Sequence, residues 1–317
     1  MELNKLYEVL EILKKSIMIM WKNSKLIAIV TSIYLIIAPL FVILNISTVK
    51  PMIFDFVTKS MLLPSLDPHG LIFLQVLNTI QKDLKTFLGT EVVFLLALFI
   101  TSLIAQTTII LLTGVSYKDK NISLKDLFVK VPKPLTRMFI TSFHATLLRV
   151  GFLYIGLFSV MVPTIMAFGH KIVSQMILWV LVVIFVSLYL YFSVVWVLSL
   201  VVSVQEECSG IEALGRAGRL VKGKKFDGFV LNLLVNLVAY VFFHFLSMMM
   251  MVKESTLSQA FFLFILMGLI CLVVMFEFQA YTVLYFECKK NHGEGIELPW
   301  SVEYSKIPRV PLGEELL

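Results

Sequence analysis

The sequence lacks the features by which most enzymes and secreted proteins are recognised. It has only three cysteines in 317 residues. None of the three falls in a segment that we place outside the cytosol, so no disulfide framework is predicted. There is no HExxH motif, no GxSxG motif and no glycine-rich phosphate loop, and no aspartate lies within a long apolar run. We therefore expect no enzymatic activity, no cofactor and no metal site.

Charge is also scarce, because charged residues make up 15% of the chain and hydrophobic residues 59%, with a mean hydropathy of +0.92. These values lie outside the range of soluble domains. A bilayer core of about 30 Å needs about 20 apolar residues in a helix. Six continuous stretches meet that length, at about 25–46, 92–115, 138–166, 173–204, 229–251 and 257–286. We predict an all-α fold, a polytopic membrane bundle of six transmembrane helices plus short interfacial amphipathic helices, forming a single domain over 1–317.

Positive charge is distributed unevenly among the connecting segments. Of the 27 Lys and Arg residues, 20 fall in the N-terminal segment, the second and fourth loops and the tail, and six fall in the other three loops. The positive-inside rule then places both termini in the cytosol, with 1–24 as an amphipathic segment and 287–317 as a short tail. The net charge of +6 indicates attraction to anionic lipid head groups rather than to nucleic acid. Protein partners are unknown. The first span is expected to act as an uncleaved signal anchor, in the endoplasmic reticulum or endomembranes or in the plasma membrane.

Two segments outside the spans have amphipathic patterns. The first 24 residues space apolar side chains by three or four positions, which is typical either of a helix at the cytosolic interface or of a helix packed on the bundle. The first outer loop, 47–91, contains Pro51, Pro64 and Pro68. We expect these prolines to break it, and its second half to lie on the outer surface as another interfacial helix.

The fourth loop combines a helix-start signal with a run of cations. Ser209 and Glu212 fit a capping box, which predicts a short helix ending near Gly223. The candidate contacts to anionic lipid are Arg216, Arg219, Lys222, Lys224 and Lys225. The alternative is an ordinary solvated basic face. Glu206 and Glu207 precede this loop at a span end, where we interpret them as solvated carboxylates.

Several segments around this loop resemble a plant family of uncharacterised six-span transmembrane proteins. They are the run 196–206 (WVLSLVVSVQE), the run 210–224 (GIEALGRAGRLVKGK), the run 279–289 (QAYTVLYFECK) and the late Val-Pro-Leu at 310–312. Some members of the family carry the label polyadenylate-binding-protein-binding protein. The pattern is more loosely similar to the membrane domain of bacterial glycerophosphodiester phosphodiesterases, whose catalytic barrel this chain lacks. The resemblance implies the six-span fold and no particular activity.

Two opposite charges stand within spans at matched depth. Arg149 lies about 11 residues into the third span and Glu277 about 9 residues before the end of the sixth, so both lie about 14–17 Å deep. We predict that they pair, because an unpaired charge at that depth is costly. The pair is either a structural clamp or a transport site. Cys288, beside two lysines at the membrane boundary, is a candidate for S-palmitoylation, with an unmodified thiol as the alternative.

These observations leave two functional classes in front. The first is a non-enzymatic membrane scaffold or bilayer-shaping protein that acts through its interfacial helices. The second is a transporter or channel for a small solute or ion that uses the Arg149–Glu277 region.

Overall fold

The computed structural model describes residues 2–22, 24–67, 69–118, 124–166, 171–251 and 256–295. All regular structure in these ranges is helical. The α-helices are α1 (Glu2–Lys22), α2 (Ser24–Leu62), α3 (Leu71–Tyr117), α4 (Leu124–Lys130), α5 (Pro132–Met166), α6 (Lys171–Gln205), α7 (Ile211–Leu220), α8 (Lys225–Met251) and α9 (Thr256–Asn291), with short 3₁₀ turns at Leu63–Ser65 and Val221–Gly223. The predicted tail from residue 296 onward lies outside the described residues.

Six helical segments are long and apolar enough to cross a membrane. They are Lys25–Ser65, Leu71–Tyr117, Pro132–Ser159, Leu178–Gln205, Lys225–Phe245 and Phe261–Asn291. Their side chains are mainly exposed aliphatic and aromatic groups, as expected for surfaces that face lipid rather than water. The all-helical class and the six apolar helices that the sequence predicts are therefore confirmed.

The first outer loop differs from its prediction. A break occurs at Pro64, where the 3₁₀ turn Leu63–Ser65 follows α2, but none occurs at Pro51, because α2 continues through it to Leu62. Pro68 lies outside the described residues, and the helix predicted for the second half is present as the first part of α3, which begins at Leu71, rather than as a separate helix. At 1.5 Å per residue, 39 and 47 residues give helices of about 59 and 70 Å, well beyond a bilayer core. The Lys59 ammonium bridges Asp55 on its own helix at 2.9 Å and Asp83 of α3 at 2.8 Å. This contact between the two extensions lay beyond what local proline rules could predict.

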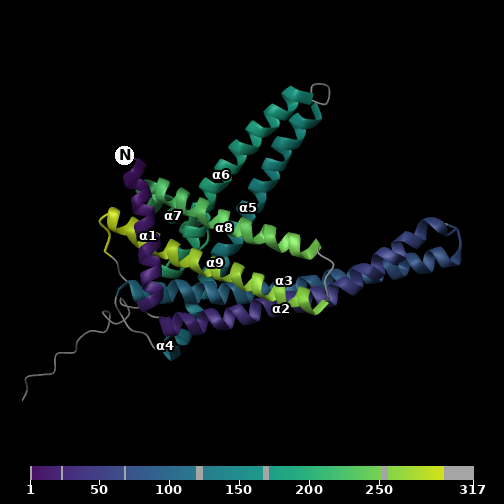
Figure 1. The fold of residues 1–317 in the computed structure, drawn as a ribbon, viewed down its shortest axis with the longest axis horizontal. Coiled ribbons are helices and arrows are strands. Elements are labelled where there is room, and N and C mark those ends of the chain that lie inside the picture. Colours follow the sequence, from purple (N-terminus) through teal and green to yellow (C-terminus); the bar gives the residue numbers. More distant parts are fainter. Residues whose placement is uncertain are drawn as a thin grey trace, which may run out of the picture. The chain divides into compact units, whose positions relative to one another are not determined.

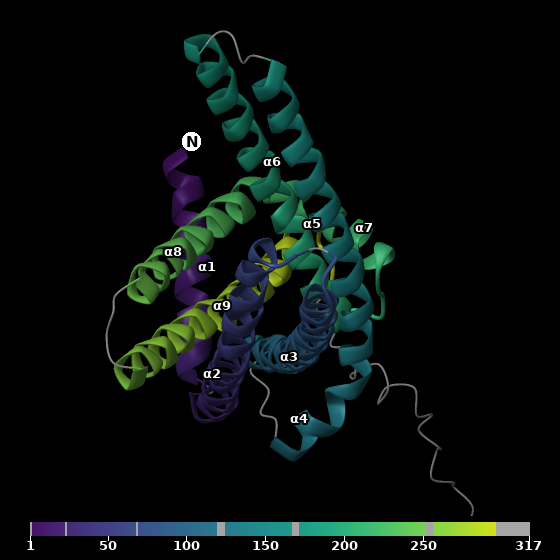
Figure 2. The same ribbon diagram turned by 90° about the vertical axis from the view of Figure 1, so that its right-hand side faces the viewer.

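The chain divides into two compact units. Unit 1 comprises Met1–Ile27, Gln106–Leu237 and Phe276–Leu317, and unit 2 comprises Ala28–Ala105 and Val238–Met275. Helices α1, α4, α5, α6 and α7 belong wholly to unit 1. Within this unit, α5 and α6 pair as an antiparallel hairpin, and α7 packs against both of them (Figure 1, Figure 2). The candidate functional residues all lie in unit 1.

The buried core of unit 1 is rich in small hydroxyl side chains. Ser116, Thr141, Ser199, Ser203 and Thr282 are buried, and each hydroxyl donates to a main-chain carbonyl three or four residues earlier. Such hydroxyls satisfy their own polarity within the helix and allow close helix approach, as is usual between membrane helices. Fully buried apolar groups such as Ile109, Leu198 and Leu284 fill the space between them.

Close packing between α5 and α6 is concentrated at one glycine. A Cβ placed on Gly156 of α5 would collide with the ring of Phe185 on α6, whereas a Cβ on Gly151 would meet nothing within 4 Å. The ring of Phe185 stacks on that of Phe152 with 4.7 Å between the centroids. The absence of a side chain at Gly156 thus permits the aromatic contact that joins the hairpin.

Candidate functional site

A network of charged groups centred on Glu206 ties together four elements at the end of α6. Arg216 of α7 donates from Nε to Glu206 Oε2 at 3.0 Å and also pairs with Glu294. From α9, the hydroxyl of Tyr285 donates to Glu206 Oε1 at 2.9 Å, and Lys289 Nζ lies 3.2 Å from the same oxygen. The main-chain carbonyl of Glu206 accepts from Arg137 of α5 at 2.7 Å. We call the side-chain contacts among Glu206, Arg216, Tyr285, Lys289 and Glu294 the Glu206 network.

The electrostatics of this network favour its ionised state. Burial by itself would raise the pKa of Glu206, but hydrogen bonds from Arg216 and Tyr285 and the charge of Lys289 hold that pKa below its usual value. Hydrogen bonds to Glu294 and Glu206 in turn raise the pKa of Arg216. Glu206 is therefore a carboxylate at neutral pH, and its lone pairs are used by partners from two other helices.

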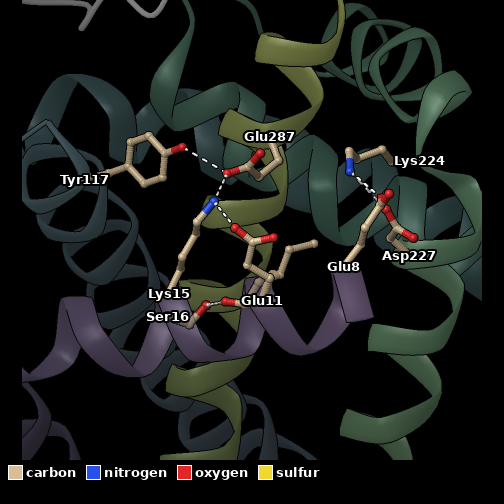
Figure 3. A network of polar contacts seen from close by, with 9 residues as sticks. Glu8, Glu11, Lys15, Ser16, Tyr117, Lys224, Asp227 and Glu287 are labelled. Carbon is tan, nitrogen blue, oxygen red and sulfur yellow. Dashed lines mark hydrogen bonds and ion pairs between the residues drawn. The ribbon is translucent and has the colours of Figure 1, made fainter. Parts of the chain in front are cut away.

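Two further ionic contacts, drawn in Figure 3, fix α1 to the same unit. Lys15 lies 2.8 Å from Glu287 of α9 and 3.0 Å from Glu11 of α1, and the hydroxyl of Tyr117 of α3 donates to Glu287 at 3.2 Å. We call these four residues the Glu287 clasp. Side-chain hydrogen bonding to Glu287 raises the pKa of Lys15, which keeps it charged throughout the physiological range.

The second contact joins α1 to the start of α8. Lys224 Nζ lies 2.8 Å from Glu8 and 3.3 Å from Asp227, and we call these three residues the Lys224 clasp. Burial alone would lower the pKa of Lys224, but the two carboxylates outweigh it and raise that pKa. Figure 3 shows α1 crossing the last turns of α9 rather than running alongside them. The helix is thus held across the end of the bundle in unit 1.

Helix α1 shows apolar side chains on two opposite faces. Val9, Ile12 and Ile19 are buried, together with Ser16, whose hydroxyl donates to the carbonyl of Ile12. On the opposite face the outer stripe consists of side chains that are 48–79% exposed: Tyr7, Leu10, Ile17, Met18 and Trp21. The sequence left open whether this segment packs on the bundle or lies at an interface. The structure shows the packing and also an apolar face suited to an interface.

The fourth-loop helix exists, but it does not begin as predicted. The N-cap is Gly210, with φ of 59°, and no side chain caps the helix, so the capping box of Ser209 and Glu212 is wrong. The backbone N–H of Gly210 instead donates to the hydroxyl of Thr141 of α5 at 2.8 Å. A positive φ favours glycine, and the partner of its N–H lies 69 residues away in the sequence. The start of α7 is therefore positioned by a contact with α5 and not by a local side-chain cap.

The five candidate lipid contacts separate into two groups. Arg216 and Lys224 are engaged in the ion pairs described above. Lys225 is exposed, with its Nζ 5.6 Å from the ring centre of Tyr191, and Arg219 and Lys222 are exposed as well. Contact with anionic lipid stays a prediction, and it is carried by Arg219, Lys222 and Lys225.

The intramembrane charges lie near each other without touching. The guanidinium of Arg149 lies 5.8 Å from the ring centre of Trp196, and its buried Nε has no hydrogen-bond partner. Glu277 interacts with Arg149 electrostatically, but within the described ranges neither side chain forms an ion pair. One turn after Glu277, the hydroxyl of the fully buried Tyr281 also has no partner. Direct pairing of Arg149 with Glu277 therefore stays a prediction.

The cysteines are poorly placed for modification. Cys288, the candidate for S-palmitoylation, is 0% exposed, and Cys208 and Cys271 are buried too. Burial raises the pKa of the Cys208 thiol to about 11, which suppresses the reactive thiolate. Acylation of Cys288 would require local opening of α9. Across the part of the chain that the structure describes, no three His, Cys, Asp or Glu residues gather as a metal site would require.

One family covers nearly the whole chain. Residues 2–302 match a domain of unknown function, DUF8558. The chain belongs to the DUF8558 family. No curated protein matches it, and no solved structure does. The function of this DUF8558 protein is therefore inferred from its own geometry.

Sequence reasoning missed the central residue of this DUF8558 protein. Its place at a span end predicts that Glu206 is a solvated carboxylate, whereas its side chain is only 19% exposed and belongs to the Glu206 network. Its partners lie 10, 79 and 83 residues away. The available signal was an acid at the end of an apolar helix, in a chain whose predicted cytosolic segments hold most of the cations. That signal predicts that the partner of Glu206 is positively charged, but it does not predict which residue the partner is.

Proposed function

We propose that this protein is a non-enzymatic membrane scaffold that shapes the bilayer through helices held at its predicted cytosolic surface. One observation carries the proposal. The Glu287 clasp and the Lys224 clasp fix α1 to α3, α8 and α9 in unit 1, so α1 cannot reorient freely relative to the ends of those helices. A surface helix in a fixed orientation transmits the shape of the bundle to the surrounding lipid. A helix that pivots freely does not.

The same proposal includes where the protein lies and which lipids it meets. The excess of Lys and Arg in the N-terminal segment, the second and fourth loops and the tail supports a place for both termini in the cytosol, with the protein in endomembranes or the plasma membrane. The exposed Arg219, Lys222 and Lys225 then face the leaflet that carries anionic lipid.

The test reconstitutes the full-length protein into vesicles of phosphatidylcholine and phosphatidylserine and measures vesicle diameter and tubulation by electron cryomicroscopy. The wild type is expected to narrow or tubulate the vesicles. The double variant Lys15→Gln/Lys224→Gln, which loses both clasps, is expected to do so less. Lys82→Gln/Lys85→Gln is the matched control, because it removes the same charge from exposed positions of α3. Vesicles unchanged by the wild type would refute the function.

The lipid contacts are tested separately in the same protein. Arg219→Gln/Lys222→Gln should reduce the phosphatidylserine retained by the purified protein, as measured by native mass spectrometry, because two cations near the head groups are lost. Lys82→Gln/Lys85→Gln should retain the wild-type amount. Equal retention by the two variants would show that the fourth-loop cations do not select anionic lipid.

A second candidate function, transport of a small solute or ion, is favoured by one observation. The buried Nε of Arg149 and the buried hydroxyl of Tyr281 both lack partners among the described residues. Unpaired polar atoms in apolar surroundings are costly and often mark functional sites. This alternative predicts ion flux into proteoliposomes that Glu277→Gln abolishes. A wild-type flux no greater than that of empty liposomes would exclude it for the ions tested.

A further inference from the structure

The outer stripe of α1 requires an explanation that its packing does not provide. Tyr7, Leu10, Met18 and Trp21 are 70, 55, 60 and 79% exposed, although α1 is already held to the bundle by its opposite face. A surface helix of a soluble protein would turn polar groups outward there. Apart from Lys14, the charged side chains described between Tyr7 and Lys22 lie on one narrow flank, and three of them, Glu8, Glu11 and Lys15, belong to the two clasps. Helix α1 therefore has an apolar face buried against the bundle and a second apolar face on its opposite side. In water that second face would stay exposed.

We infer that the outer stripe of α1 inserts into the acyl–headgroup boundary of the leaflet on its own side of the membrane, and that this leaflet is anionic. Charge complementarity supports that choice of partner. Lys14 is exposed within the stripe, and the exposed Lys25 follows its end, where it begins the first span. A lysine within or beside an apolar stripe can extend its ammonium to anionic head groups, while a tryptophan at the end of the stripe, such as Trp21, prefers the interface.

The acids of α1 do not oppose this arrangement. Glu8 and Glu11 are partly exposed, but Glu8 is paired with Lys224 and Glu11 with Lys15. Each clasp sets one lysine against two carboxylates, so it offsets their charge only in part, but it holds the flank that bears Glu8 and Glu11 against α8 and α9 and away from the outer stripe. The outer stripe is left facing away from the bundle at a fixed orientation.

This inference rests on the proposed scaffold function, and the experiment separates the two. The full-length protein is labelled with the environment-sensitive fluorophore NBD at Met18→Cys, and in a second variant at Leu10→Cys, because its own three cysteines are buried. Glu207→Cys, at an exposed position outside both clasps, is the matched control. Each sample is reconstituted into vesicles of phosphatidylcholine with phosphatidylserine and challenged with lipid-attached nitroxide or with aqueous iodide.

Probes on the stripe are expected to emit at shorter wavelength than the control, to be quenched more by the lipid nitroxide and less by iodide. Adding Lys14→Glu should shift the Met18→Cys probe toward water-like emission, and more so in phosphatidylserine vesicles than in phosphatidylcholine alone. Stripe probes quenched by iodide as strongly as the control overturn the inference. Probes shielded from both quenchers also overturn it, in favour of a protein contact. Insertion without vesicle shaping leaves the inference standing and refutes the proposed function.

Discussion

Replacing Glu206 with glutamine removes the charge at the centre of the Glu206 network while keeping the size of the side chain. The wild-type carboxylate accepts from Arg216 at 3.0 Å and from Tyr285 at 2.9 Å, and it lies 3.2 Å from Lys289. A hydrogen bond to a charged group is worth about 1.5–3 kcal/mol. Arg216 and Lys289 both keep Glu294 as a partner, so the contacts are not lost in full. We expect a loss of about 2–4 kcal/mol in the free energy of unfolding.

The assay is thermal unfolding in nanodiscs, with Glu207→Gln as the matched control. Glu207 is the next residue and is exposed, so the same charge change there should alter stability by less than about 0.5 kcal/mol. Because the pKa of Glu206 is lowered in the folded state, its contribution is fully present above its unfolded pKa and is lost as the pH falls through the folded value. The difference between wild type and Glu206→Gln should therefore narrow below about pH 4.5. Equal losses in the two variants at pH 7 would refute the network as a stabilising element.

Three other predictions concern the spans and the orientation. Arg149→Leu and Glu277→Leu should each lower the thermal stability of the protein, and Glu277→Leu should lower it more, because the guanidinium left behind cannot lose its charge. The double variant should recover part of the lost stability, and strictly additive losses would exclude coupling between the two residues. Gly156→Ala should cost about 1–3 kcal/mol by overpacking the α5–α6 contact, whereas Gly151→Ala on the same helix should be neutral or slightly stabilising, and equal effects would contradict the packing argument. Asn121, which lies outside the described residues, should carry no glycan because its loop is predicted to be cytosolic, and mass spectrometry that finds one would reverse the orientation.

Features encoded by local periodicity could be predicted from the sequence, and features that depend on distant partners could not. The six apolar helices follow from run length alone, because lipid leaves the backbone few other solutions. The existence of helix α7 follows from the local start and stop signals at Ser209, Glu212 and Gly223. Its start does not, because Gly210 is fixed by Thr141 of α5. A capping pattern describes what a peptide can do in isolation, and a tertiary donor or acceptor overrides it.

The long extensions of α2 and α3 are a second case in which a local sequence signal fails. Here the signal predicts a break in a helix that continues. Pro51 predicts a break, because proline removes a backbone donor. The helix nevertheless continues through it and pairs with α3 through Lys59 and Asp83. A single lost hydrogen bond is a local cost, and it is opposed by the helical hydrogen bonds that the rest of α2 keeps and by the contact of Lys59 with Asp83. Rules based on local sequence include the hydrogen bond lost at Pro51, but they do not include the contact between α2 and α3.

Counting the cations of a loop does not predict which of them are paired with carboxylates, because the count treats all of them as equivalent. The positive-inside bias includes Arg216 and Lys224 along with Arg219 and Lys222, yet the first two are engaged by carboxylates and only the second two face outward. Under the proposed function, Lys224 acts on lipid indirectly, through α1. Lys224 pairs with Glu8 as well as Asp227 and, with Lys15, holds α1 in the orientation in which its outer stripe faces away from the bundle. If this is correct, neutralising Lys224 should affect vesicle shape more than it affects lipid retention, and neutralising Lys222 should do the reverse. The two cations lie two residues apart, so a difference in that sense would arise from their partners and not from their place in the sequence.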